Sequence, residues 1–168
     1  MRTTLLLPLS FLLFAFIGKP LPVLGNASPD LLRVGSKYYI LAAICGRGGG
    51  LTLGSRGNNK TVLLHVVQEQ NILKYGSPMT FSPVNPKNGV IRESIDLNIK
   101  FEVAKTSVQS TVWKLDNLMQ YWGRICAIGG VRGNPGPQTT RNWFMIEKFY
   151  GDYKLVFYPS HYKKKDLS

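Results

Sequence analysis

Cysteine and histidine are scarce in this chain of 168 residues, which contains two of each: Cys45, Cys126, His65 and His161. No two of them have the close spacing of a metal site, and neither cysteine has a histidine nearby in the sequence. His65 also lies between two apolar residues, a setting that favours a structural role over a catalytic one. The sequence therefore predicts no enzyme activity, no metal site and no cofactor.

Acidic residues are also few, since nine Asp and Glu stand against 21 Lys and Arg and give a formal net charge of +12. The basic residues are scattered, and only Lys163–Lys165 forms a run. Nucleic-acid binding is therefore not expected, and a solvated basic surface is the better interpretation. We interpret Glu93, Asp96 and Asp116 as turn and strand-end residues rather than as paired catalytic carboxylates.

Long apolar runs are absent except at the N-terminus, where Leu5–Ile17 is almost entirely apolar and follows Arg2. This run is too short to span a bilayer and is typical of a secretory signal. The small residues Gly25 and Ala27 predict cleavage after Ala27, with cleavage after Gly25 as the alternative. We therefore expect a signal peptide over residues 1–27 and a secreted protein, extracellular or vacuolar, with no membrane contact once the signal is removed.

The remaining chain, residues 28–168, has the length of one domain. Stretches rich in β-branched and aromatic residues predict strands at Tyr38–Ile44, Thr61–Val67, Met79–Phe81, Leu97–Val103, Thr111–Leu115, Trp143–Phe149 and Lys154–Phe157. The glycine-rich stretch 46–50 predicts a tight turn rather than a phosphate-binding loop, because no Gly-Lys-Ser/Thr follows it. No segment sustains an amphipathic helix, so the sequence predicts an all-β sandwich or barrel.

Several blocks of the chain follow one another in an order that is specific to one family. They are Lys37–Leu41, Gly89–Phe101, Ser110–Asp116, Gly133–Pro137, Asn142–Lys148 and Tyr153–Phe157. In these blocks the chain resembles the plant Kunitz protease inhibitors of the soybean trypsin inhibitor type, including the miraculin-like members. The resemblance implies a β-trefoil, a barrel closed by three similar lobes, and a secreted inhibitor of trypsin-like serine proteases.

The chain departs from the family in its cysteines. Such inhibitors carry two disulfides, and the four aligned positions hold other residues here: Val62, Ser107, Tyr158 and Tyr162. Cys45 and Cys126 lie elsewhere, and the sequence leaves open whether they form a bridge or remain thiols. Losing a native disulfide typically costs about 2–5 kcal/mol, so we expect reduced stability and weakened inhibition.

The ends of the domain are a second departure. Ser28–Asp30 runs almost directly into Leu31–Gly35, where the family has a further strand, and the sequence ends soon after Phe157, where the family continues with another hairpin. The expected fold is therefore a β-trefoil that is incomplete at its first strand and at its C-terminal hairpin. Missing strands would leave edges of the sheets without partners.

The resemblance places the inhibitory loop just before the block at residues 90–94. The residues of this reactive loop are Val84, Asn85, Pro86, Lys87, Asn88 and Gly89. Lys87 aligns with the primary specificity position and would enter an acidic S1 pocket, with Arg92 as the second choice. The alternative is that Lys87 is an ordinary charged residue at a loop tip. Family members brace this loop with an Asn side chain, and Val34 stands in the corresponding place.

Two other functions remain open. A miraculin-like storage, glycan-binding or receptor-binding protein would use exposed aromatic residues, and the candidates are Trp122, Trp143 and Tyr150. For Trp143, in an alternating strand, a place in the core is the better interpretation. A degenerate relative with no partner is the third reading. Asn59-Lys60-Thr61 predicts N-glycosylation at Asn59, whereas cleavage after Ala27 would destroy the similar motif at Asn26.

Overall fold

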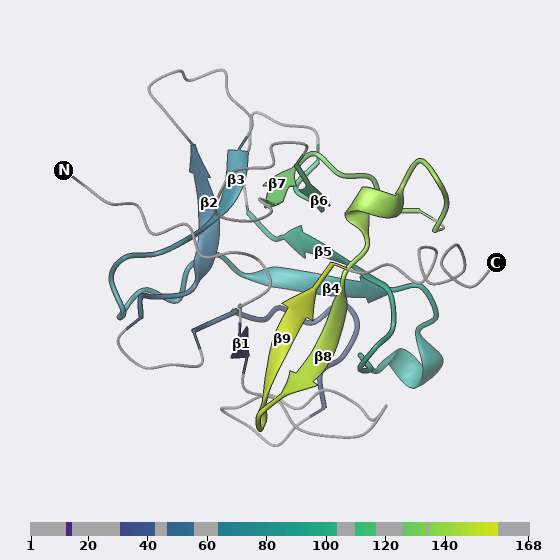
Figure 1. Cartoon of the computed structure of the whole chain (residues 1–168), viewed down its shortest axis with the longest axis horizontal. Helices are drawn as coiled ribbons and strands as arrows, with labels where there is room; N and C mark the ends of the chain where they lie inside the picture. The colour runs from purple at the N-terminus through teal and green to yellow at the C-terminus, as the bar shows by residue number, and fades with distance from the viewer. Residues whose placement is uncertain are drawn as a thin grey trace.

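The computed structural model of the chain describes residues 13–14, 31–42, 47–55, 64–103, 110–116, 126–133 and 135–157. Within these ranges the regular elements are β-strands and short 3-10 turns (Figure 1). The strands are β1 (Leu13–Phe14), β2 (Leu51–Ser55), β3 (Leu64–Gln68), β4 (Met79–Pro83), β5 (Leu97–Phe101), β6 (Trp113–Leu115), β7 (Cys126–Ile128), β8 (Met145–Phe149) and β9 (Asp152–Val156). The turns are η2 (Lys87–Gly89) and η3 (Thr140–Asn142). The prediction of an all-β fold is confirmed.

The strands pair antiparallel in three groups, with the orders β1-β9-β8, β2-β3-β7-β6 and β4-β5. Isolated bridges connect these groups. Leu97 of β5 pairs with Phe144, just before β8, and Lys100 of β5 pairs with Val112, just before β6. The hairpin β4–β5 therefore joins the other two groups, and it crosses the middle of the molecule in Figure 1.

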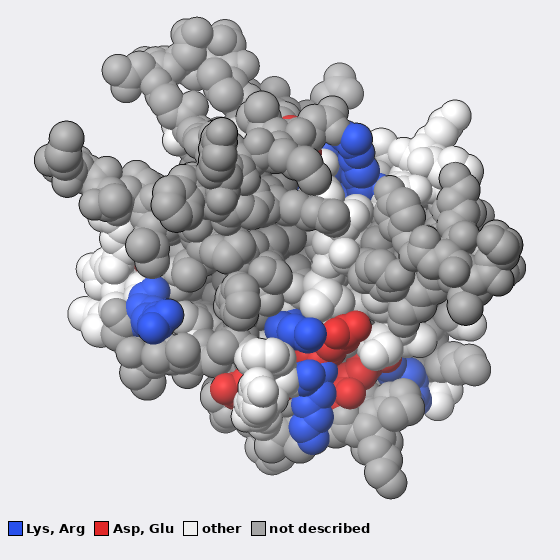
Figure 2. All heavy atoms as spheres, viewed as in Figure 1, with Lys and Arg blue, Asp and Glu red and all other residues white. Residues whose placement is uncertain are grey.

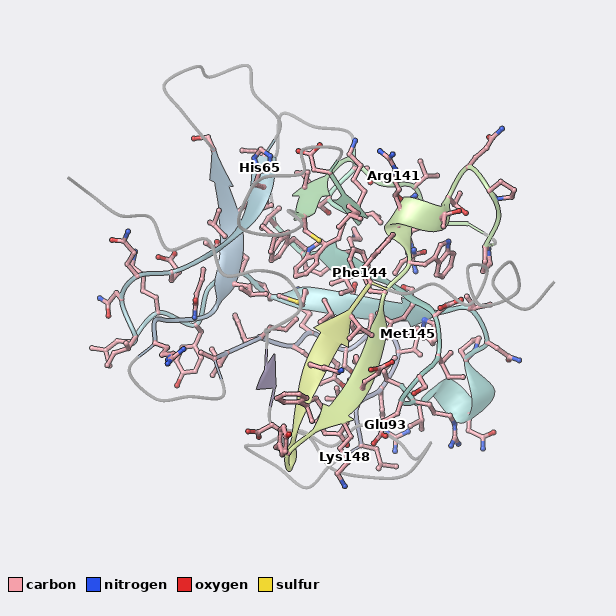
Figure 3. All side chains as sticks on the ribbon, viewed as in Figure 1. His65, Glu93, Arg141, Phe144, Met145 and Lys148 are labelled. Atoms are coloured by element: carbon pink, nitrogen blue, oxygen red, sulfur yellow. The ribbon has the colours of Figure 1, made fainter. Side chains whose placement is uncertain are left out.

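Large apolar side chains from all three groups meet in one core. The rings of Phe101 and Trp113 lie 5.2 Å apart between centroids, and those of Trp113 and Phe144 lie 6.1 Å apart. All three side chains are fully buried, and Phe144 is labelled in Figure 3. Alternate residues of β9, Tyr153 and Leu155, are buried in the same cluster. The described strands therefore form one domain around a shared aromatic centre.

Most predicted strands overlap observed ones, but the prediction for Tyr38–Ile44 is wrong over residues 38–42. Tyr38 makes an isolated bridge with Met79, while the carbonyl of Ile40 accepts a hydrogen bond from the N–H of Leu51 at 3.0 Å. Successive backbone groups of this segment therefore bond to different partners, and no continuous ladder forms. Residues 43–44 lie outside the described residues.

The sequence did not predict β2, β7 or the true role of the glycine run. Both strands are short of β-forming residues, and β2 contains a glycine. The predicted tight turn is wrong over residues 47–50, because the N–H groups of Gly49 and Gly50 instead donate to the carbonyls of Glu69 and Lys74, at 2.7 and 2.8 Å. Gly46 lies outside the described residues.

The strand β1 falls within the predicted signal peptide. It pairs with the outer edge of β9, with Leu13 opposite Lys154 and Phe14 opposite Tyr153. Removal of residues 1–27 would take this partner away and leave that edge of β9 exposed. In the described part of the chain, no helix is long and apolar enough to cross a membrane.

Candidate functional site

The predicted reactive loop follows β4 and lies in the connection between β4 and β5. The last ladder pair is Pro83 with Leu97, and the N–H of Val84 then donates to the carbonyl of Asp96 at 2.9 Å. Beyond this bond the chain leaves the hairpin and forms η2, the teal coil at the lower right of Figure 1. The residues Val84–Pro86 are exposed, so the loop projects from the body of the domain.

The tip of the loop is a tight turn with two left-handed residues. Asn88 has φ 59° and ψ 22°, and Gly89 has φ 66°. The N–H of Gly89 closes the turn on the carbonyl of Pro86 at 3.4 Å. Asparagine and glycine are the residues that adopt this conformation most readily. Lys87 is the first residue of this turn. Its backbone is described, and its side chain lies outside the described part of the structure.

This turn differs from the extended shape of a substrate bound to a protease. The bond between Lys87 and Asn88, which the family resemblance aligns with the scissile bond, lies inside η2. A protease that reads an extended segment would require Asn88 to leave its left-handed conformation. Because the turn must first open, only a fraction of the molecules is ready to bind.

Main-chain hydrogen bonds fix the end of the loop to residues 32–34. The N–H of Val34 donates to the carbonyl of Gly89 at 2.9 Å, and the N–H of Ile91 donates to the carbonyl of Leu32 at 2.8 Å. Arg33 pairs with Val90 in a bridge between these two bonds. Val34 lacks the bracing side chain that the family uses, as the sequence indicates, but its backbone holds the loop instead.

Arg92, the second candidate for the specificity residue, lies in the body of the domain. Its neighbours Ile91 and Glu93 are both buried. Glu93 accepts a hydrogen bond from the hydroxyl of Tyr153 at 2.9 Å, which fixes this part of the chain against β9. Burial, together with the bond to Glu93 and its charge, raises the pKa of Tyr153 above its ordinary value. Arg92 is therefore less well placed than the loop tip to enter a protease.

The other predicted sites divide into those that the structure describes and those that it does not. Cys126 is a free and buried thiol in β7, and burial, with a contribution from the charge of Asp116, raises its pKa above the ordinary value. A buried, protonated thiol is chemically inert. Trp143 is 2% exposed, which supports its interpretation as a core residue. Cys45, Asn59 and Trp122 lie outside the described residues.

His65 occupies a structural position, as its apolar neighbours predict. Its Nε2 atom lies 3.2 Å from Oδ2 of Asp116, and the residue, which belongs to β3 and pairs with Ala127 of β7, is buried (Figure 3). In the described part of the chain no group of three His, Cys, Asp or Glu side chains could hold a metal ion. The pair therefore ties the end of β6 to β3.

The described basic side chains do not form one continuous patch on the face seen in Figure 2. On the face seen in Figure 2, the described Lys and Arg side chains lie in separate groups, some of them against acidic ones. Lys154 pairs with Glu147 at 3.3 Å across the β8–β9 hairpin, and Lys100 pairs with Glu102 at 3.0 Å. Partly exposed pairs of this kind each contribute about 1 kcal/mol or less.

Comparison with solved structures defines the fold class. The chain superposes on the Kunitz-type cysteine protease inhibitor PCPI-3 from potato with a TM-score of 0.68, at 31% identity, over 84% of this chain and 77% of that one. The fold is therefore a β-trefoil, as the sequence predicts. The potato protein inhibits cysteine proteases according to its name, so the fold alone does not fix the target.

The sequence then identifies the family. Residues 27–167 match the model of the legume Kunitz family, described as "Trypsin and protease inhibitor", and the chain belongs to this family. It is 42% identical to miraculin of Synsepalum dulcificum over 156 residues, which are 89% of this chain and 70% of miraculin. It is 41% identical to Kunitz trypsin inhibitor 5 of Arabidopsis thaliana over 133 residues, which are 77% of this chain and 62% of that protein. The description of the family and the name of the Arabidopsis relative are those of inhibitors rather than enzymes.

Proposed function

We propose that the chain is a secreted inhibitor of trypsin-like serine proteases and that Lys87 enters the S1 pocket of the protease. One observation carries this proposal: main-chain bonds at Val84 and Gly89 hold both ends of an exposed loop whose tip contains Lys87. A loop fixed at its ends loses little further freedom on binding. A lysine is the side chain that an acidic S1 pocket accepts.

Inhibition is weaker than an extended loop would give, because η2 must open first. The left-handed conformation of Asn88 turns the backbone away from the line that a protease cleft follows. The apparent affinity equals the affinity of the open loop multiplied by the fraction of open molecules. The hydrogen bonds at its two ends therefore favour binding, whereas the turn at its tip opposes binding.

The inhibition constant for trypsin tests the assignment of Lys87. Lys87→Ala should abolish inhibition, while Lys87→Arg should preserve it, because arginine also carries the positive charge that the pocket binds. Lys74→Ala is the matched control, since the side chain of Lys74 is 60% exposed on a different loop. Arg92→Ala should also leave the constant unchanged. Inhibition that depended on Arg92 and not on Lys87 would refute the assignment.

A second candidate is a miraculin-like protein that binds glycans or a receptor, and Tyr150 is the residue that favours it. Tyr150 is 94% exposed at the tip of the β8–β9 hairpin, and its ring meets that of Phe149 edge-on at 4.6 Å. Such a ring offers a face on which a sugar can stack. Glycan-array binding that Tyr150→Ala abolishes would support this function. A folded protein that inhibits trypsin and binds no glycan would exclude the glycan-binding function.

Secretion and modification form part of the proposal. We propose that the signal peptide is cleaved after Ala27, that Asn59 is glycosylated, and that the protein is extracellular or vacuolar. Mass spectrometry of the secreted protein should find Ser28 at its N-terminus. A mobility shift on enzymatic deglycosylation should persist in Asn26→Gln and disappear in Asn59→Gln. A shift that survived Asn59→Gln would contradict the assigned glycosylation site.

A further inference from the structure

The connection between β3 and β4 displays two large apolar side chains at the tip of a tight turn. Ile72 is 59% exposed and Leu73 is 80% exposed. The N–H of Lys74 closes the turn on the carbonyl of Asn71 at 3.1 Å, and the N–H of Leu73 donates to Oδ1 of Asn71 at 2.9 Å. Single exposed apolar residues are ordinary in soluble proteins, but two adjacent ones at a braced tip form a projecting apolar point.

Further apolar side chains adjoin this turn. Tyr75 is 64% exposed and lies edge-on to Tyr39, with ring centroids 5.8 Å apart, while Tyr39 is 48% exposed. Leu41, from the same segment as Tyr39, is 43% exposed. We call these residues the apolar turn surface, and its members are Tyr39, Leu41, Ile72, Leu73 and Tyr75. Its two tyrosine rings contact each other, and each carries a polar hydroxyl.

The glycine run explains how the turn is held. The N–H groups of Gly49 and Gly50 donate to the carbonyls of Glu69 and Lys74, on either side of the tip. A Cβ atom at Gly49 would collide with the carbonyl oxygen of Asn71, and one at Gly50 would collide with that of Tyr75. Only glycine permits so close an approach of two backbones. The run is therefore a cradle that fixes the turn and its exposed side chains.

The segments that form the apolar turn surface also carry basic side chains. Lys37, Arg47 and Lys74 are exposed within the segments that form the surface and its cradle, namely 37–41, 47–50 and 69–76. Glu69 is the one acidic residue of these segments, and it pairs with Lys74 at 3.5 Å. The net charge of the segments is positive, as is that of the whole chain, at +12. A partner that suits this surface therefore has an apolar region for the apolar side chains and, next to it, negative charge for the basic ones.

We propose that the apolar turn surface docks onto an anionic lipid bilayer. Ile72 and Leu73 enter the boundary of the acyl chains, Tyr39 and Tyr75 lie at the level of the headgroups, and the basic residues face the anionic headgroups. Tyrosine favours this interfacial position, and Lys and Arg favour an anionic surface. A convex point of two residues suits a bilayer, which needs no complementary pocket, better than the face of a protein. This proposal replaces the expectation that the secreted chain has no membrane contact.

Co-sedimentation of the secreted protein, after removal of the signal peptide, with vesicles tests the proposal. Wild type should bind vesicles of mixed phosphatidylcholine and phosphatidylserine more tightly than vesicles of phosphatidylcholine alone. Leu73→Asn should weaken binding to the mixed vesicles by about tenfold or more, because burial of a leucine side chain is lost. Val131→Asn is the matched control, since Val131 is 62% exposed on another loop, and it should bind as wild type does. Both changes leave the net charge unaltered.

A second measurement locates the inserted residue. Trp emission of Leu73→Trp should shift to shorter wavelength when the mixed vesicles are added, whereas that of Val131→Trp should not. Vesicle binding that Leu73→Asn does not weaken would assign it to the general basic charge and overturn the proposal. Absence of binding to any vesicle, with self-association that Leu73→Asn abolishes, would overturn it in favour of a second copy of the chain. Trypsin inhibition should be the same in all these variants, since none touches the reactive loop.

Discussion

The backbone N–H of Val34 donates a hydrogen bond of 2.9 Å to the carbonyl oxygen of Gly89. This bond joins residues 32–34 to the end of the proposed reactive loop. Every residue except proline carries such a donor, so the brace does not depend on a polar side chain at this position. The valine therefore retains part of the support that the family obtains from an asparagine.

Removing this donor should weaken trypsin inhibition. Val34→Pro lacks the N–H, and the lost bond contributes about 0.5–1.5 kcal/mol, so the inhibition constant should rise by about two- to tenfold. Val34→Ala keeps the N–H and should inhibit as wild type does. The constants are compared for variants whose melting temperatures establish that they are folded. Equal inhibition by Val34→Pro and Val34→Ala would contradict the bracing role of the bond.

Opening the turn at Asn88 should strengthen inhibition. A β-branched residue is disfavoured in the left-handed conformation by about 1–2 kcal/mol, so Asn88→Thr should shift the loop toward extended forms. The inhibition constant for trypsin should then fall by up to about tenfold.

The matched control for this change is Asn88→Gly. Glycine also removes the asparagine side chain but still permits the left-handed turn, so inhibition should not improve. If both variants inhibited equally, the conformation of Asn88 would not limit binding.

The sequence predicts the strands that carry their own local signal. β4, β5 and β8 have alternating or continuous apolar residues with β-branched and aromatic side chains, and their positions follow from these patterns. β2 has no such signal, because Gly54 interrupts it, yet that glycine lies where a Cβ atom would press within 2.6 Å of Cγ2 of Val67. Glycine is needed at this position because a side chain of β3 packs against it, and the local sequence of β2 cannot predict that contact.

The candidate site divides in the same way. Its predicted place in the chain follows from the blocks that resemble the Kunitz family, and in the structure this segment lies between β4 and β5. The bond from Val34 and the cradle at Gly49 and Gly50 depend on backbone groups that every sequence contains. Such contacts become predictable only when the pairing of distant segments is known.

The stability of the fold should decrease in alkaline solution. The pKa values of Cys126 and Tyr153 are raised above their ordinary values of 9.0 and 10.0, mainly by burial. The folded chain therefore holds these protons more tightly than the unfolded chain. Their contribution is complete below about pH 9 and is lost as the pH rises through 9 and 10 toward the folded-state values. Urea unfolding between about pH 8 and 11 should record a falling free energy of unfolding.

Substitution of the two groups tests this origin of the pH dependence. The double variant Cys126→Ala, Tyr153→Phe should lose stability less steeply above about pH 9 than wild type does. At neutral pH it should be less stable by about 1–3 kcal/mol, because Glu93 loses the hydrogen bond that the hydroxyl of Tyr153 donates to it. An unchanged slope would assign the alkaline loss to other groups, such as exposed lysines.

Cys126 should remain a thiol that reagents reach only when the protein unfolds. Cys126 is 1% exposed and lies in the core, and its burial keeps the thiol protonated. The thiolate, not the thiol, is the form that reacts. In a Cys45→Ser variant, where Cys126 is the remaining cysteine, modification by a disulfide reagent should be slower than in urea by at least about a thousandfold, the ratio that rare unfolding permits. Intact-mass measurement of the unreduced wild type should find both thiols reduced. A mass lower by two hydrogens, with a peptide linking Cys45 to Cys126, would contradict the free thiol.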